Sequence, residues 1–456
     1  MAADMDVKQR FFPHTQDELK SLATDILRHA KELGASDAAT EIAEGDGLSV
    51  SVRHGQVDTI EHNRDKTVGV TVFIGTKRGN ASTSDFSAQA LRDTVAAAYN
   101  IARFTAEDPC AGLAEVELLE KNPPELDLYH PWQLSADQAV EIAQRAEQAA
   151  FDTDPNIRNS EGASVSAQHS QFVLATSQGF LAGYPYSRHY VACSPIAGSG
   201  RNMQRDDWYT SQRNANDLAA PEAIGRYAAQ RALARLGARG LDTRKCPVLF
   251  EAPLAAGLLG AFVQATSGGA LYRKTSFLCD SLGKQVLAPH IQIIEDPHVK
   301  RATGSAPFDE EGVRTQRRNV VTDGVVDGYF LSTYSARKLG MRTTGNAGGS
   351  HNLYLRSKHT QADDDFRAML KKLGTGLLLT ELMGQGVNYV TGDYSRGASG
   401  FWVENGEIQF PVEGITVAGR LQDMFQQIVA IGADTLMRGT KETGSILIEQ
   451  MTIAGQ

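Results

Sequence analysis

Histidine side chains are the first candidates for chemistry in this chain of 456 residues, which contains eleven of them. A catalytic zinc ion usually takes three protein ligands, and two histidines one helical turn apart are a common platform for it. No two histidines have that spacing on a predicted helix. His54 and His62 flank a predicted hairpin, His189 falls on a predicted strand, and His351 follows a glycine pair. This pattern favours surface or internally hydrogen-bonded histidines over a metal centre.

Segments rich in serine, glycine or acidic residues are further candidates for chemistry, and each also has a structural interpretation. Ser395–Gly400 resembles a catalytic serine loop, but it lacks the G-x-S-x-G pattern, so a structural turn is favoured. Gly374–Gly376 and Gly384–Gly386 lack the lysine and hydroxyl residue of a phosphate-binding loop. Asp363–Asp365 could bind a cation, but a helix cap is the favoured interpretation. The acids of Pro307–Gly312 could be catalytic, but a loop with an ordered aspartate turn is the favoured interpretation.

The composition excludes several classes of protein. The net charge of −9 disfavours binding to nucleic acid, because an acidic surface repels phosphate. The longest apolar run, 252–263, is too short to span a bilayer, and the first residues lack the apolar core of a signal peptide. The four cysteines are scattered without C-x-x-C spacing, which favours a reducing compartment. We therefore expect a cytoplasmic protein that binds neither membrane nor nucleic acid.

The N-terminal segment predicts a helix, a meander of strands and a second helix. A capping box at Thr15–Glu18 begins the first helix, and Gly34 ends it. A turn is predicted at Asn63–Lys66. The alternating segments predict strands at 48–53, 56–62, 67–74 and 79–84, and apolar spacing predicts the second helix at 88–104.

The same order of elements then occurs again. A helix predicted at 135–151 precedes Ser164–Phe172, which matches Ser49–Val57 at five of nine positions. Further predicted strands and a helix at 221–236 complete the second unit. The repeated order predicts a duplication, with coincidence between two amphipathic strands as the alternative.

The C-terminal half combines strands with few helices and many glycines. Helices are predicted at 253–265, 363–373 and 421–431, and strands at 248–250, 291–295, 328–332 and 445–453. Strands and helices do not alternate regularly, so the fold class predicted is α+β. Two linkers, 121–131 and 237–246, divide the chain into a first unit (1–120), a second unit (121–240) and a strand-rich C-terminal domain (241–456).

One long string carries a family resemblance. Gly384–Gly419 predicts a strand, a Gly/Ser-rich loop at 394–400 and a hairpin with a type I′ turn at Asn405–Gly406. This string resembles the C-terminal signature of the TldD/PmbA family, especially its PmbA (TldE) branch. Gly304–Thr315, Asn319–Gly328 and Thr343–Ala347 match the family in the same order along the chain.

The resemblance implies a function for a peptidase-like chain without the peptidase's metal ligands. TldD carries zinc on a His-Glu-x-x-x-His helix, and no such motif occurs here. Its motif positions fall on Gly260, Ala261 and Ala265, and no cysteine follows Cys279 to replace its late cysteine ligand. The resemblance implies a heterodimer with a zinc-bearing TldD-like subunit that cleaves unfolded peptides, with no cofactor in this chain. A homodimer is the alternative assembly.

Two other functions stay open at this point: an autonomous peptidase with atypical metal ligands, and a non-enzymatic regulatory protein that modulates gyrase. The resemblance is densest between residues 304 and 419, so we expect the subunit interface in the C-terminal half. The residues expected to line a substrate cleft lie in two segments of that half: Gly345, Asn346, Tyr394, Ser395 and Arg396.

Overall fold

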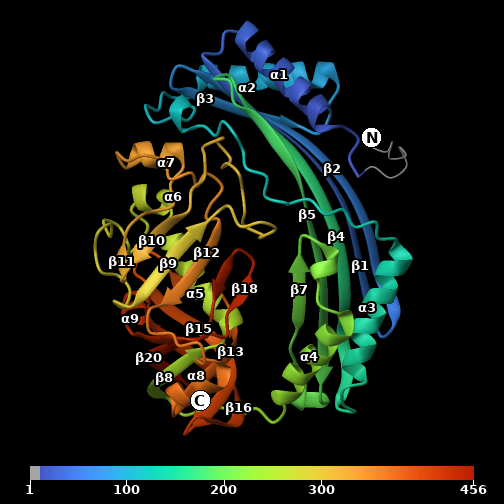
Figure 1. Ribbon diagram of the computed structural model, residues 1–456, viewed down its shortest axis with the longest axis vertical. Helices are drawn as coiled ribbons and strands as arrows, with labels where there is room; N and C mark the ends of the chain where they lie inside the picture. Colours follow the sequence, from blue (N-terminus) through green and yellow to red (C-terminus); the bar gives the residue numbers. More distant parts are fainter. Residues whose placement is uncertain (1–10, 456) are drawn as a thin grey trace.

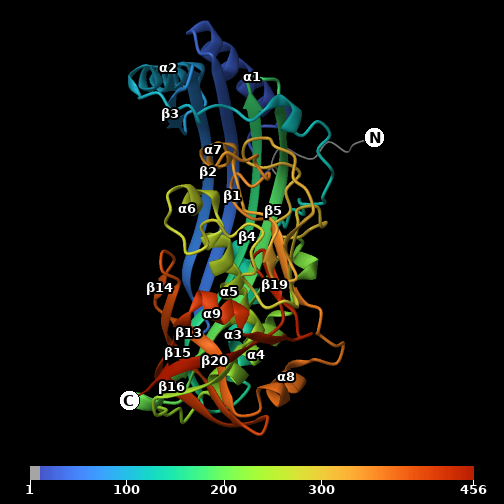
Figure 2. The same cartoon turned by 90° about the vertical axis from the view of Figure 1, so that its left-hand side faces the viewer.

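The computed structural model describes residues 11–455, and its N-terminal half builds one long antiparallel sheet (Figures 1 and 2). The strand order is β3-β2-β1-β4-β5-β6, and β7 also pairs with β5. The central pair, β1 and β4, joins the first unit to the second. The strands are β1 (Asp37–Arg53), β2 (Gln56–Ile74), β3 (Lys77–Thr83), β4 (Ile157–Thr176), β5 (Leu181–Ala197), β6 (Gln204–Arg205) and β7 (Trp208–Gln212).

Four helices cover one face of this sheet. They are α1 (Gln16–Glu32), α2 (Ala88–Phe104), α3 (Ala136–Phe151) and α4 (Pro221–Ala234). Side chains alternate along a strand, so the even-numbered residues of β1 face the helices. Ala38 and Ile42 pack in one apolar cluster with α1 and α2, while Val50 and Val52 pack in a second cluster with α3 and α4. The odd-numbered residues of β1 face away from the helices.

The predicted repetition of helix, strands and helix is present in the structure. The order α1-β1-β2-β3-α2 recurs as α3-β4-β5-β7-α4, with capping boxes at Thr15 and Ser135 starting the first helix of each unit. The nine-residue match does not mark equivalent positions, however. Ser49–Val57 crosses the turn from β1 into β2, whereas Ser164–Phe172 lies wholly inside β4. Polar strands of similar alternation produce such matches without common placement.

The turn predicted at Asn63–Lys66 is wrong. Residues 56–74 form the single strand β2, which pairs with β1 from Gln56 to Phe73. Ladder hydrogen bonds to β1 along the whole length outweigh the local preference of asparagine and aspartate for turns.

The C-terminal half contains a mixed sheet and a closed barrel. The sheet has the order β11-β10-β9-β12-β19-β18. In the barrel, β13-β8-β20-β16-β15 pair in sequence, and β15 pairs back with β13. The strands of the sheet are β9 (Ile291–Asp296), β10 (Arg318–Thr322), β11 (Val325–Val326), β12 (Asn352–Ser357), β18 (Leu436–Arg438) and β19 (Lys441–Thr443). The barrel and its attached strands are β8 (Arg244–Phe250), β13 (Gly376–Met383), β14 (Val387–Asn388), β15 (Asp393–Glu404), β16 (Glu407–Arg420), β17 (Ile428–Ile431) and β20 (Ile446–Ala454).

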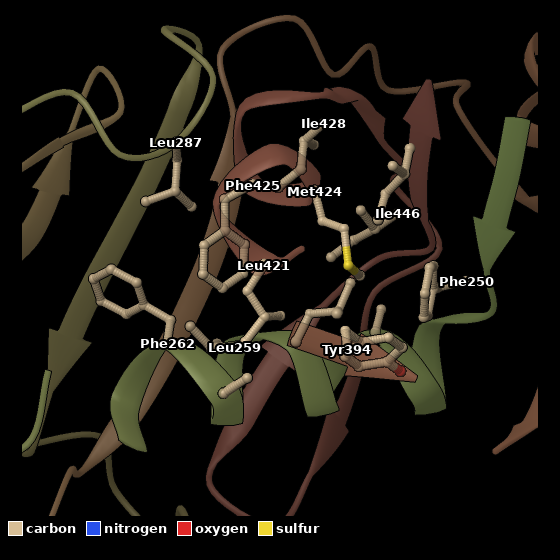
Figure 3. Close-up of a cluster of buried hydrophobic side chains, with 14 of the residues drawn as sticks. Phe250, Leu259, Phe262, Leu287, Tyr394, Leu421, Met424, Phe425, Ile428 and Ile446 are labelled. Atoms are coloured by element: carbon tan, nitrogen blue, oxygen red, sulfur yellow. The ribbon is translucent and has the colours of Figure 1, made fainter. Parts of the chain in front are cut away.

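An apolar helix fills the space between the C-terminal sheet and the barrel. This helix, α5 (Ala252–Ala265), directs Leu259 and Phe262 into a buried cluster that includes Phe425 and Ile446 (Figure 3). The remaining helices are short: α6 (Gly268–Tyr272), α7 (Thr333–Lys338), α8 (Phe366–Leu373) and α9 (Leu421–Gln426). Mostly antiparallel sheets with helices that do not alternate with strands confirm the α+β class.

Three local predictions in this half are wrong. The helix predicted at 421–431 ends at Gln426, and Ile428–Ile431 continues as β17 against β20. Residues 328–332 are irregular apart from one bridge at Phe330. The predicted loop at 394–400 belongs to β15, where small residues let strands approach closely. A Cβ on Gly400 would lie 1.9 Å from the carbonyl oxygen of Leu378.

The hairpin turn at Asn405–Gly406 is confirmed. It joins β15 to β16, and both central residues have positive φ, 53° and 79°. The predicted cap of α8 is also present, because Asp365 accepts a hydrogen bond from the N–H of Ala368. Among residues 11–455, none of the helices combines the length and apolar character needed to cross a bilayer.

Candidate functional site

A cleft of about 340 Å³ lies between the two halves of the chain. One wall is the helix-free face of the N-terminal sheet, with Glu41, Phe172 and Tyr184. The opposite wall is made by two C-terminal loops, 303–310 and 347–351. Aromatic rings line the sheet side of the cleft, where Phe172 and Tyr184 lie edge to face with ring centroids 4.7 Å apart. The cleft is therefore built by segments far apart in the sequence.

A buried carboxylate, Glu295 on β9, holds His351, which lines the cleft. It accepts hydrogen bonds from Arg318 Nε at 2.7 Å, Asn346 Nδ2 at 2.8 Å and His351 Nδ1 at 3.0 Å. Burial alone would raise the pKa of Glu295, but the hydrogen bond from His351 and the charge of Arg318 lower it to about 2. Glu295 therefore stays ionised and fixes the orientation of the His351 ring.

Glycines allow the loop at 347–351, before β12, to approach the loop at 303–310. Gly345, Gly348 and Gly349 all have positive φ. A Cβ on Gly348 would lie 2.5 Å from a carboxylate oxygen of Glu310, so only glycine fits this contact. The glycine-rich sequence thus positions His351 and Glu310 at one cleft.

Asp309 forms the aspartate turn predicted from the sequence. Its carboxylate accepts hydrogen bonds from the backbone N–H groups of Glu311, Val313 and Ala347. Burial, followed by the charge of Glu311, nevertheless raises the pKa of Asp309 to about 7. This residue holds the two loops together by its backbone contacts.

The positions that the family resemblance implies for a zinc motif offer no ligand for a metal ion. Gly260, Ala261 and Ala265 lie on α5, and both alanines are buried in the apolar core. Lys441 lies beside this helix, with its Cε 3.7 Å from a Cβ built on Gly260, and burial lowers the pKa of its amine. Among residues 11–455, no three His, Cys, Asp or Glu side chains are grouped so that they could hold a metal ion.

The structure separates the five residues predicted to line a substrate cleft. Gly345 and Asn346 lie in the loop that leads into the cleft, but the Asn346 side chain is buried against Glu295. Tyr394 packs in the barrel core near Leu421 and Met424, and burial raises its pKa to about 12 (Figure 3). Ser395 and Arg396 follow it on β15, and none of these three residues is in the cleft lining.

Sequence reasoning missed the residues that do line the cleft. Glu310 lies in the acidic segment Pro307–Gly312, and His351 follows the pair Gly348–Gly349, so a sequence pattern marked both residues. Glu41, Tyr184 and Phe172 had none, because alternation along a strand does not reveal what faces it across a tertiary contact.

A second cleft, lined by β7, α4 and the barrel, has a different character. Arg231 pairs with Glu251 at 2.7 Å and with Asp206 at 3.2 Å, and Arg235 pairs with Glu381. Trp208 carries Arg438 over its ring at 4.2 Å. These ion pairs connect the N-terminal half of the chain to the C-terminal half.

Comparison with known proteins agrees with this architecture. Three models of the PmbA/TldA metallopeptidase match: domain 1 at residues 42–102, the central domain at 129–236 and the C-terminal domain at 243–455. The chain is 48% identical to metalloprotease PmbA of Escherichia coli O157:H7 over 96% of this chain and 97% of that protein. It is 23% identical to a metalloprotease TldD homolog of Haemophilus influenzae, over 89% and 86% of the two chains.

Solved structures show the same fold. A putative modulator of DNA gyrase from Bacteroides thetaiotaomicron has a TM-score of 0.90 and 25% identity, covering 96% of this chain and 99% of that one. TldE from Thermococcus kodakarensis has a TM-score of 0.82 and 18% identity, covering 95% and 100%. The chain belongs to the PmbA/TldD metallopeptidase family, in its PmbA/TldE branch.

Proposed function

We propose that this chain is the PmbA/TldE-type subunit of a TldD/TldE-like zinc metallopeptidase that cleaves unfolded peptides. The zinc belongs to a TldD-like partner, and this chain shapes the substrate chamber. One observation supports the proposal: all three domains of the metallopeptidase family are matched along the chain, while the positions that we propose to correspond to the zinc motif are Gly260, Ala261 and Ala265, which offer no ligand. Glycine and alanine have no side-chain atom that could bind a metal ion.

The cleft between the two halves suits an extended peptide. The helix-free face of the N-terminal sheet presents small polar side chains on β1 and β4, such as Ser49, Ser166 and Ser170, and tyrosines on β5. Small hydroxyl groups and aromatic faces contact a backbone without demanding one side chain. The proposed chamber is therefore tolerant of peptide sequence.

The assembly follows from the missing ligands. A subunit without metal supports hydrolysis only if another chain completes the site, so a heterodimer is proposed over a homodimer, with the interface in the C-terminal half. Such an interface needs about 1,200–2,000 Å² of buried surface in total. The four free cysteines support a reducing compartment, so the proposal places the complex in the cytoplasm.

Metal analysis and peptide cleavage test the proposal. The chain purified alone should hold well below one zinc per chain and should not cleave an unfolded peptide. Co-expression with a TldD-like chain should give a heterodimer that holds zinc and cleaves that peptide faster than the TldD-like chain alone. One tightly bound zinc in the isolated chain, lost together with peptidase activity on chelation, would instead establish the autonomous peptidase.

Any effect of this protein on gyrase is proposed to arise from proteolysis. The net charge of −9 opposes contact with DNA, so an effect on gyrase would act through cleavage of a protein substrate. An inactive heterodimer that changes gyrase activity equally well would favour the non-enzymatic regulatory alternative.

A further inference from the structure

One edge of the N-terminal sheet is open along most of a strand. β2 pairs with β1 from Gln56 to Phe73, but β3 covers the other edge of β2 only from Val68 to Ile74. In the described part of the chain, no strand pairs with residues 56–67 on that side, and all of these residues are exposed. The backbone N–H and C=O groups of such an edge are available to another strand.

The open edge lacks most of the features that protect an exposed strand. Residues 56–67 contain no proline and no glycine, and the register shift of this hairpin lies near its turn, between Ser51 and Val52. Two apolar side chains are exposed on it, Val57 at 48% and Ile60 at 51%. Charged side chains are present, and charges usually keep edge strands apart. The order of these charges along β2 therefore decides whether a second strand can pair there.

The charges on β2 are complementary to those of a second copy of the same strand. Antiparallel pairing about a two-fold axis at His62 places Asp58 of each copy opposite Lys66 of the other, so the same ion pair forms twice. Ile60 then lies opposite Arg64, whose hydrocarbon stem can cover it. In this register, no two acids and no two lysine or arginine side chains are directly opposite. Opposite charges at facing positions stabilise an antiparallel pair.

The neighbouring two-fold registers are disfavoured by the same charges. An axis at Glu61 places that carboxylate opposite its own copy, and an axis at Asn63 places Glu61 opposite Asp65. Like charges at facing positions destabilise a strand pair. The sequence of β2 therefore selects the register centred on His62.

The two side chains that this register pairs are accessible. Asp58 has a long hydrogen bond, 3.4 Å, from Ser51 Oγ, and Lys66 lies over the Phe86 ring at 5.0 Å. Neither side chain forms an ion pair within residues 11–455. Both charges can therefore turn to a partner across the strands without breaking an existing ion pair.

We propose that two copies of this chain associate weakly through the open edge of β2, with Asp58 and Lys66 paired reciprocally about His62. The two-fold axis of such a pair is perpendicular to the sheet, so the helix-free faces of both copies lie on the same side. The two seven-stranded sheets then form one continuous sheet. This interface is separate from the contact with a TldD-like subunit, which the proposed function puts in the C-terminal half.

Sedimentation velocity of the purified full-length chain tests the association. A contact between two strand edges is smaller than the ~1,200 Å² of a stable interface, so a dissociation constant of roughly 10–100 μM is expected. D58K and K66D each put like charges at both reciprocal positions and should weaken association roughly 10-fold or more. An equimolar mixture of D58K and K66D recreates both opposite-charge pairs and should associate as the wild type does. D93K, a charge change at an exposed position of α2, should have no effect.

A disulfide between copies tests the register. Directly opposite residues have Cα atoms about 4.5–5.5 Å apart, which is within disulfide reach. H62C should therefore form a cross-linked dimer on mild oxidation, and H62C/K66D should not. R64C, which this register places opposite Ile60, should not form that dimer either. The wild-type chain with its four free cysteines is the background control.

A wild-type chain that stays monomeric at every concentration would overturn the inference, as would association that is unchanged in D58K and K66D. A mixture of these two variants that fails to associate, or cross-linking of R64C as fast as that of H62C, would also reject the pairing. All of these results leave the metallopeptidase proposal intact, because metal content and cleavage with a TldD-like chain test that proposal separately.

Discussion

Acidification should destabilise the N-terminal sheet through one buried histidine. His169 on β4 is 2% exposed, stacks on Phe11 at 3.6 Å, and accepts a hydrogen bond from the N–H of Trp132 at 3.1 Å. Its Nδ1 is buried without a partner. Burial, with the neighbouring His189 second, lowers the pKa of His169 from 6.5 to about 4.

The sign and size of the effect follow from linkage. Below pH 6.5 the unfolded chain binds a proton at this residue, while the folded chain does not until about pH 4. Stability contributed by the neutral ring is therefore complete above pH 7 and is lost as the pH falls toward 4. At about 1.4 kcal/mol per pKa unit, the loss is about 2 kcal/mol at pH 5 and about 3 kcal/mol at pH 4.

Urea unfolding between pH 4 and 8 measures this loss. Fluorescence of Trp132, whose ring lies 5.3 Å from that of His189, reports on this region of the sheet. His169→Gln keeps an acceptor for the Trp132 N–H but removes the titrating ring, so its stability should fall by about 2 kcal/mol less between pH 7 and pH 5. His54→Gln, which removes an exposed histidine at the turn between β1 and β2, is the control. Identical pH profiles for wild type and His169→Gln would refute the reasoning.

Four further predictions concern packing and charge. Gly406→Val should lower stability by about 1–3 kcal/mol, because φ is 79° and a Cβ would lie 2.9 Å from the backbone of α8; unchanged thermal unfolding would contradict it. Gly225→Ala should lower the melting temperature, because its Cβ would lie 1.9 Å from a carbonyl oxygen of α3. Gly257→Ala in α5 meets nothing within 4 Å and should raise stability by up to about 1 kcal/mol, so equal effects of the two alanines would disprove the packing argument. Glu295→Gln should cost about 3–5 kcal/mol in denaturant unfolding by leaving Arg318 without its buried carboxylate, and a near-neutral variant would rule out this role.

Local signals predicted the elements whose causes are local. The capping box at Thr15–Glu18, the positive-φ pair at Asn405–Gly406 and the aspartate turn at Asp309 each depend on a few adjacent residues, and all are present. Even the order of the repeated units could be predicted, because helical and strand periodicities alternate visibly along the N-terminal half.

Other local signals were overruled by pairing across the fold. Ladder bonds to β1 kept residues 63–66 extended, and β20 drew Ile428–Ile431 out of a helical pattern. Gly/Ser-rich residues 394–400 form a strand because the barrel needs small side chains where strands touch. In each case the decisive partner lies outside the window that a periodicity samples.

The sequence by itself determined the fold class and the repeated order of helix, strands and helix in the N-terminal half. Tertiary structure alone decided the cleft. Glu41, Glu310 and His351 come from three segments of the chain, and Glu295 lies 56 residues from the histidine that it orients. Helix and strand patterns arise from neighbours within a few residues. A cleft lined by several segments depends instead on which faces meet, and the packing of the two halves fixes that contact.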